Sequence, residues 1–239
     1  MVLDTGSAVV WVPSITASAI WTKHNLYDPS QSETASLKDS PFRRTYGTKV
    51  IKGRIFEDRI KVGELTFESF AFGAADEVVD YPIYEHFDGV LGMAIKSEHE
   101  GMRRTFLERL ANRKFGLFFR SGEEESIMVV GDEAEKYMPR EAYQIPLTSE
   151  SYWTVKFHWM FVGRVSFNMN GYRAALDTGS IVAELPTHIM EAIDMELKVT
   201  GLQGVLHQVD CSKIKELPAI ELLGDEVQLK ILPSQYILQ

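Results

Sequence analysis

The sequence contains the same five residues twice. Residues 3–7 and residues 176–180 both read Leu-Asp-Thr-Gly-Ser, and the two aspartates, Asp4 and Asp177, stand 173 positions apart. Each copy follows small or apolar residues and precedes a mostly apolar stretch that ends in a proline nine positions after the aspartate. Two chance copies would occur in on the order of one in a hundred thousand chains of this length. The repeat therefore predicts a duplicated fold with two equivalent halves.

The composition supports a packed, acidic protein and excludes several other classes. The 239 residues carry a net charge of −9 and are 45% hydrophobic. This hydrophobic content excludes general disorder, and the acidic balance argues against a nucleic-acid or anionic-membrane partner. No apolar run approaches the ~18–20 residues that span a bilayer, so we expect no membrane insertion. Met1-Val2-Leu3 leads directly into Asp4, so we expect no secretory leader in this sequence.

Cysteine and histidine usage argues against a metal centre. Cys211 is the single cysteine of the sequence, which leaves neither an internal disulfide nor a cysteine cluster. No two of the six histidines are three or four residues apart, so a zinc-binding helix is not expected either. We therefore expect no metal and no cofactor.

The region between the two copies of the repeat has mainly the pattern of β-structure. Residues 42–72 alternate apolar and polar side chains over several stretches, with Gly47, Gly53 and Gly63 as expected turn points. This pattern predicts a hairpin followed by a second hairpin.

Other segments have equally simple patterns. Further strands are expected over residues 127–131 and over residues 152–169, the latter broken at Gly163, and helices over residues 102–115 and 187–197. The acidic run at residues 122–126 is interpreted as a solvated turn.

An aspartate at the end of a short apolar strand, followed closely by glycine, presents its carboxyl group at an open turn. If the two halves face each other about a pseudo-two-fold axis, Asp4 and Asp177 meet and share one proton. The ionised carboxylate can then take a proton from water while the protonated one donates to a carbonyl oxygen. This is hydrolysis of an amide without a metal or a covalent intermediate. The hydroxyls of Thr5 and Thr178 would cross to the opposite turn and lock the two together.

Over its whole length, the chain resembles the pepsin-like aspartic endopeptidases, peptidase family A1. Besides the two repeats, the resemblance rests on Trp11-Val12-Pro13-Ser14, on Tyr46-Gly47-Thr48, which is similar to the tip of the family's flap, and on Phe87-Asp88-Gly89-Val90-Leu91-Gly92. The surroundings of Cys211, Leu217-Pro218 and residues 233–239 are similar as well.

The resemblance implies a mostly β, bilobal fold with a few short helices and an active-site cleft between the lobes. Residues 1–147 would form the N-terminal lobe with the first catalytic aspartate and the flap. Residues 148–239 would form the C-terminal lobe with the second catalytic aspartate.

The resemblance also implies the site residues. Asp4 and Asp177 would be catalytic, and the Tyr46 hydroxyl would bond to the indole N–H of Trp11 while its ring covers the cleft. The residues expected to contact substrate are Gly6, Trp11, Tyr46, Gly47, Thr48, Phe87, Gly179 and Ser180. Tyr81, Ile83 and Val90 are further candidates for an apolar pocket, and each is about as readily explained as plain core.

The sequence also departs from the family pattern. The family has roughly thirty residues before the first catalytic aspartate and a further segment after the counterpart of Gln239, so we expect a fragment that lacks both ends and is a poor or inactive protease as written. Cysteines for two family disulfides are absent. Ala8, Ile181 and Glu184 stand where the family usually has small or hydroxyl residues.

Two functions remain open at this stage. The leading expectation is a monomeric aspartic endopeptidase that cleaves peptides or proteins between apolar residues at acid pH, in a secreted, lysosomal or vacuolar setting. The alternative is a pepsin-fold protein without catalysis that binds peptides or partner proteins, favoured by the missing ends and by the charge of Glu184. A dimeric retroviral-type protease is excluded because that design has one Asp-Thr-Gly in a short chain.

Overall fold

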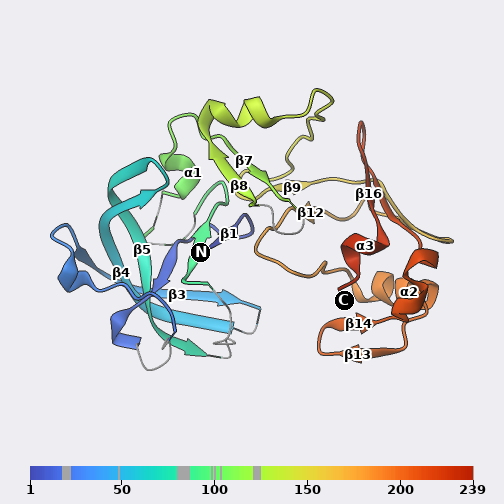
Figure 1. Ribbon diagram of the computed structural model, residues 1–239, viewed down its shortest axis with the longest axis horizontal. Helices are drawn as coiled ribbons and strands as arrows, with labels where there is room; N and C mark the ends of the chain where they lie inside the picture. The colour runs from blue at the N-terminus through green and yellow to red at the C-terminus, as the bar shows by residue number, and fades with distance from the viewer. Residues whose placement is uncertain are drawn as a thin grey trace. The chain divides into compact units, whose positions relative to one another are not determined.

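The computed structural model describes residues 1–17, 23–47, 49–79, 87–97, 99, 101–102, 104–120 and 125–238. It divides into two compact units (Figure 1). The first unit comprises Met1–Pro139, Glu150–Trp153 and Asp177–Ser180, and the second comprises Arg140–Ser149, Thr154–Leu176 and Ile181–Gln239. The chain passes between these units several times. The second copy of the repeat therefore belongs largely to the first unit.

A six-stranded sheet forms the first unit, with the strand order β1-β6-β2-β5-β4-β3. Its strands are β1 (Val2–Asp4), β2 (Trp11–Pro13), β3 (Ser36–Tyr46), β4 (Lys49–Val62), β5 (Leu65–Val79) and β6 (Val90–Gly92). The β1–β6 and β2–β5 pairs are parallel, while β3, β4 and β5 pair antiparallel. The smaller elements are η1 (Ile15–Ala17), η2 (Pro29–Gln31), α1 (Phe106–Arg109), η3 (Gly131–Tyr137) and the hairpin of β7 (Phe115–Phe118) with β8 (Ile127–Val130).

The second unit contains an antiparallel sheet of order β11-β10-β15-β16. Its elements are β9 (Thr154–Val155), β10 (Trp159–Val162), β11 (Val165–Asn168), β12 (Ala174–Ala175), α2 (Thr187–Leu197), β13 (Gly201–Gln203), β14 (Leu206–Gln208), η4 (Cys211–Glu216), β15 (Ile220–Leu223), β16 (Gln228–Ile231) and α3 (Pro233–Tyr236). Ile189, Ile193 and Leu197 recur at helical spacing along α2, and all three are buried with Met160 and Val162 of β10. The helix expected over residues 187–197 is thus confirmed.

Most of the strands expected from the sequence are present. Gly47 and Gly63 occupy the turns of two successive hairpins with φ of 58° and 57°, a backbone region that glycine enters without steric cost. Gly163, with φ of 57°, likewise joins β10 to β11. The strand expected over residues 127–131 ends at Val130, and residues 122–124 of the expected acidic turn lie outside the described residues.

The helix expected over residues 102–115 is wrong in its length, because α1 covers only Phe106–Arg109. A capping box between Thr105 and Glu108 starts the helix after residue 102. Leu110 is already extended, and Arg113 has a positive φ of 49°, which a helix does not allow. The apolar spacing therefore reflects burial of one short turn and its flanks: Met102, Phe106, Leu107 and Leu110 are all buried.

Gly53 is not the turn expected from the sequence. It lies inside β4, where the pairing with β5 shifts register between Lys52 and Gly53. A Cβ atom at this position would overlap the carbonyl oxygen of Ala74 on β5. The glycine therefore permits a close approach of two strands at a bulge, which sequence alternation does not distinguish from a turn.

Gly53→Ala should destabilise the protein more than Gly63→Ala. The first variant must displace backbone of β5, and we expect a loss of about 2–3 kcal/mol in the free energy of unfolding. The second has open space around its Cβ and suffers only from its positive φ, so the expected loss is about 1 kcal/mol. Urea denaturation of both variants measures the difference, and equal losses would contradict the close approach at Gly53.

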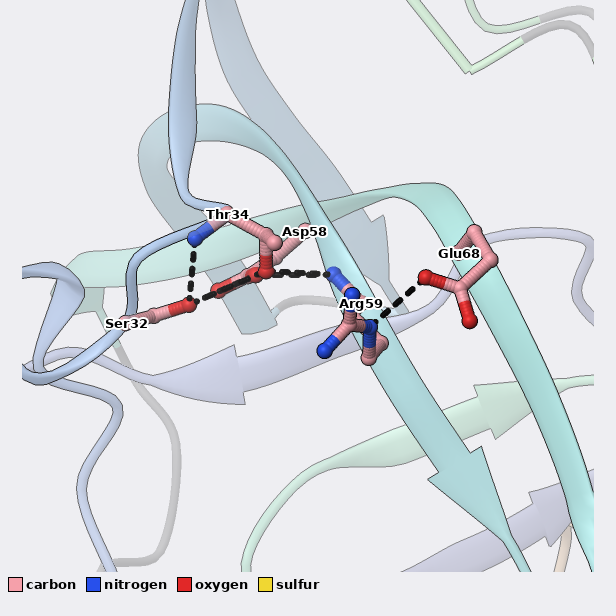
Figure 2. A network of polar contacts seen from close by, with 5 residues as sticks. All are labelled: Ser32, Thr34, Asp58, Arg59 and Glu68. Atoms are coloured by element: carbon pink, nitrogen blue, oxygen red, sulfur yellow. Dashed lines mark hydrogen bonds and ion pairs between the residues drawn. The ribbon is translucent and has the colours of Figure 1, made fainter.

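A buried carboxylate on β4 holds the loop that follows β2 (Figure 2). Asp58 is 4% exposed and accepts hydrogen bonds from the hydroxyls of Ser32 (2.8 Å) and Thr34 and from Arg59 N (2.7 Å). The Tyr27 hydroxyl donates to its other oxygen at 2.9 Å. Tyr27 N in turn donates to the carbonyl of Pro13 at the end of β2, so this network helps to fix the strand that carries Trp11.

The donors around Asp58 make its contribution to stability depend on pH. Burial alone would raise the pKa of Asp58, but the Thr34, Ser32 and Tyr27 hydroxyls and the Arg59 N–H hold it below its ordinary value. A depressed carboxyl pKa stabilises the fold above the unfolded-state value of about 3.9, and this stabilisation is lost as the pH falls through the folded-state value.

Asp58→Asn should therefore cost about 1–3 kcal/mol near pH 6, and the cost should shrink below about pH 4. Denaturant unfolding of both proteins from pH 2.5 to 6.5 measures this. The matched control is Asp132→Asn, which removes an exposed partner of Lys114 and should cost less than about 1 kcal/mol. A cost of Asp58→Asn that does not change with pH would contradict the depressed pKa.

Candidate active site

Asp4 is the last residue of β1, the edge strand of the six-stranded sheet. β1 pairs in parallel with β6, with Asp4 opposite Gly92, and Met93 N donates to the Asp4 carbonyl at 2.7 Å. The residue is 6% exposed. Its carboxyl group accepts hydrogen bonds from Gly6 N at 2.9 Å and from the Ser7 hydroxyl. The turn after β1 thus orients the carboxyl with its own backbone and side chain.

Two threonines join the copies of the repeat reciprocally. Thr5 N donates to the Thr178 hydroxyl at 3.2 Å, and Thr178 N donates to the Thr5 hydroxyl at 3.0 Å. The Thr178 hydroxyl also donates to the carbonyl of Leu3. The crossed arrangement expected from the sequence is therefore present, and it ties residues 177–180 to the end of β1.

The two carboxyl groups are held in similar ways on opposite turns. Asp177 accepts a hydrogen bond from Gly179 N at 2.8 Å, which corresponds to the bond from Gly6 N to Asp4. A Cβ on Gly6 would overlap the Asp177 carboxyl group, and a Cβ on Gly179 would overlap that of Asp4. The glycine of each repeat thus makes room for the carboxyl group of the other.

The electrostatics of this pair favour a retained proton. Burial is the largest cause that raises the pKa of Asp4, and the charge of Asp177 and a hydrogen bond with it raise it further. Hydrogen bonds from Ser7 and Gly6 act in the opposite direction without cancelling the effect. Asp4 is buried whereas Asp177 is exposed, so the two carboxyl groups differ in environment although their local geometry is alike.

Tyr46 reaches back from the end of β3 towards the same turn. Trp11 is fully buried, and its indole Nε1–H donates to the Tyr46 hydroxyl at 3.0 Å, as expected. Burial raises the pKa of Tyr46, while hydrogen bonds with Ser7 and Trp11 lower it and the charge of Asp4 raises it again. The tyrosine thus interacts with the turn that carries the first aspartate.

The remaining expected site residues occupy several environments. Gly47 is the exposed turn after Tyr46, Phe87 packs partly buried near Trp11, and Ser180 is exposed. Thr48, Tyr81 and Ile83 lie outside the described residues. Val90 is buried in β6, and Glu184 is an exposed residue of the second unit.

Sequence reasoning missed two residues of this region. Ser7 donates to Asp4 and also contacts Tyr46, and its place inside the repeated five residues was the available signal. Arg44 lies beside Tyr46 on the same face of β3, which the period of two along a strand would have indicated. In the part of the chain that the structure describes, we find neither a group of three side chains suited to a metal ion nor a helix long and apolar enough to cross a membrane.

Comparison with protein families matches residues 1–239 to the eukaryotic aspartyl proteases. The chain is 27% identical over 250 residues to the probable vacuolar protease A of Trichophyton verrucosum (strain HKI 0517), covering 62% of that protein. It is 28% identical over 249 residues to pepsin A of Bos taurus, covering 67%, and 26% identical over 250 residues to gastricsin of Cavia porcellus, covering 64%. All of this chain is covered in each case, and it spans about two thirds of the length of these relatives.

A match over the whole sequence, together with the paired Asp-Thr-Gly-Ser turns and a mostly β architecture, places the chain in the eukaryotic aspartyl protease family with a pepsin-like fold.

Removing the charge of Asp177 should lower the pKa of Asp4. In Asp177→Asn the neighbouring charge is gone but the burial remains, so the pKa should fall towards its ordinary value without reaching it. The pKa of Asp4 can be measured from the NMR chemical shift of its carboxyl carbon as a function of pH. Asp132→Asn is the control and should leave the pKa of Asp4 unchanged. An Asp4 pKa that is identical in the Asp177→Asn protein would mean that the two carboxyl groups do not interact.

Proposed function

We propose that the protein is an aspartic endopeptidase whose catalytic pair is Asp4 and Asp177. The observation that carries this proposal is the contact of two carboxyl groups on turns locked by the crossed threonine bonds. Family membership supports it, since the named relatives include a protease and two pepsin-like enzymes.

The different burial of the two carboxyl groups supports different roles, with one as the acid and the other as the base. Asp4, which is buried and has a raised pKa, holds the shared proton, and the more exposed Asp177 has the role of the base. A water molecule between them attacks the carbonyl carbon of the peptide bond while Asp177 accepts its proton and Asp4 donates to the carbonyl oxygen. Collapse of the tetrahedral intermediate then transfers a proton to the leaving amine. The cycle needs one proton on the pair, which favours activity at acid pH.

Substrate would lie beneath Tyr46 and beside the two turns. We propose that the substrate is a peptide or protein cleaved between apolar residues, and that the enzyme acts as a monomer in a secreted or vacuolar setting. The substrate-contacting residues in this proposal are Gly6, Trp11, Tyr46, Gly47, Thr48, Phe87, Gly179 and Ser180. An apolar ring with a polar end, as in Tyr46, suits a lid that must both exclude water and stay anchored to Trp11.

In a full-length form of the enzyme, Asp4→Asn and Asp177→Asn should each reduce hydrolysis of a denatured protein substrate by at least about a hundredfold between pH 3 and 6, because either change removes half of the acid–base pair. Pepstatin should inhibit the unmodified protein. Asp132→Asn, an exposed carboxyl group in an ion pair with Lys114, is the matched control and should keep its activity.

The same assay separates catalysis from binding. Full activity in either dyad variant would overturn the assignment of the catalytic pair. A protein that binds pepstatin or peptides tightly but cleaves none of them would instead be the non-catalytic peptide-binding member of the family.

A further inference from the structure

Arg44, a cation on the half-buried face of β3, has no role in the proposed mechanism. Along this strand Phe42 is buried and Arg44 and Tyr46 are half-buried, whereas Arg43 and Thr45 between them are exposed. Since successive side chains of a strand point to opposite faces, Arg44 shares a face with Tyr46 and with the core residue Phe42. A charged residue therefore occupies a position at which the strand otherwise turns apolar side chains inward.

Four other cations of this hairpin are paired with carboxylates. Lys52 contacts Glu77 at 2.9 Å, Arg54 contacts Asp76 at 3.0 Å and Arg59 contacts Glu68 at 2.7 Å. Lys38 of β3 is likewise paired with Glu57.

Arg44 differs from them. It makes no ion pair within the described residues, and its Nε is buried without a hydrogen-bond partner. Its guanidinium carbon lies 5.7 Å from the centroid of the Tyr46 ring, a cation–π arrangement that orients the group but satisfies none of its N–H donors. Partial burial of a charge without an ion-pair partner is unfavourable, and a cation–π contact offsets only part of this cost. The guanidinium of Arg44 is therefore held in place with hydrogen-bond donors that a ligand could use.

Tyr46 links Arg44 to the first turn of the proposed catalytic pair. The Tyr46 hydroxyl is bonded to Trp11 and contacts Ser7, and both the Arg44 cation and the Asp4 carboxyl group act on the pKa of Tyr46. All five residues belong to the first unit. A substrate that passes beneath Tyr46 therefore passes within reach of this guanidinium.

We propose that Arg44 is a specificity-determining residue that binds a carboxylate side chain of the substrate, so that the enzyme prefers glutamate or aspartate at a position near the scissile bond. This inference rests on the proposed endopeptidase function. The planar guanidinium offers donors in a geometry that matches a carboxylate, and the Tyr46 ring holds it in place before substrate arrives.

The substrate's own titration gives the preference a distinct signature. A glutamate side chain ionises near pH 4.3, so the attraction is absent at pH 3 and complete above about pH 5.5. The preference for glutamate over glutamine should therefore rise with pH across the range in which the catalytic pair works.

Matched peptides that differ only by glutamate or glutamine, placed in turn at each of the three positions on either side of an apolar cleavage site, test the proposal. At pH 5.5 we expect kcat/KM to be about three- to tenfold higher for glutamate at one or more positions, and the ratio to approach about one at pH 3. Arg44→Gln should reduce the ratio at pH 5.5 to about one, and Arg44→Lys should keep part of it. Arg43→Gln, which removes the neighbouring cation on the exposed face, should keep the whole ratio.

The outcomes are separable from those of the proposed function. Equal cleavage of both peptides at every position, or a glutamate preference that survives Arg44→Gln, would overturn the role of Arg44 while leaving the endopeptidase function intact. If neither peptide is cleaved, the proposed hydrolysis fails, and the ratio of their binding constants, measured by fluorescence anisotropy at pH 3 and 5.5, tests Arg44 in the same way. Thermal unfolding of each variant shows whether a lost preference reflects a lost fold.

Discussion

The reciprocal hydrogen bonds between Thr5 and Thr178 are the interaction on which the site depends. They attach four residues, Asp177–Ser180, to a unit from which the neighbouring chain on both sides departs. The opposing turn is itself well supported. Met93 N bonds to the Asp4 carbonyl, and the Met93 carbonyl accepts from the indole of Trp153, which also belongs to the first unit. Two neutral hydroxyls thus join the turns without adding a charge to the carboxyl pair.

Once the turns are joined, the chemistry follows from differences in solvent exposure. Identical local sequences give both aspartates the same bond from a glycine N–H, so the repeat alone makes them equivalent. The buried position of Asp4 removes that equivalence, since Asp177 is exposed. A pair of like carboxyl groups in unlike surroundings is what an acid and a base at one pH require. Tyr46, tied to Trp11, adds a cover whose polar end is already engaged.

The sequence predicted those features that depend on short periodic patterns or on the repeat. Helix α2 has the expected bounds because its three buried apolar residues recur at helical spacing and face one core. Gly47 and Gly63 were recognisable as turns because their positive φ favours glycine. Gly53 was misinterpreted because a strand bulge and a turn both select glycine, and only the facing Ala74 carbonyl distinguishes them. The crossings between the units were not predictable because they depend on contacts between residues far apart in sequence, such as those of residues 150–153 with Ile95 and Met93.

The packing of the two glycines has a consequence for how such a gene can change. The space beside Gly6 is filled by the carboxyl group of the second copy, and the space beside Gly179 by that of the first. A substitution in either copy is therefore felt by the catalytic group of the other, so neither half can adapt alone. The residues just outside, where Ala8 corresponds to Ile181, do not share this constraint and already differ. If the two copies arose by duplication, the flanking residues could change freely. The residues that contact the other copy, such as Gly6 and Gly179, could not. The two copies of the repeat therefore form one site, and a change in either copy must remain compatible with the other.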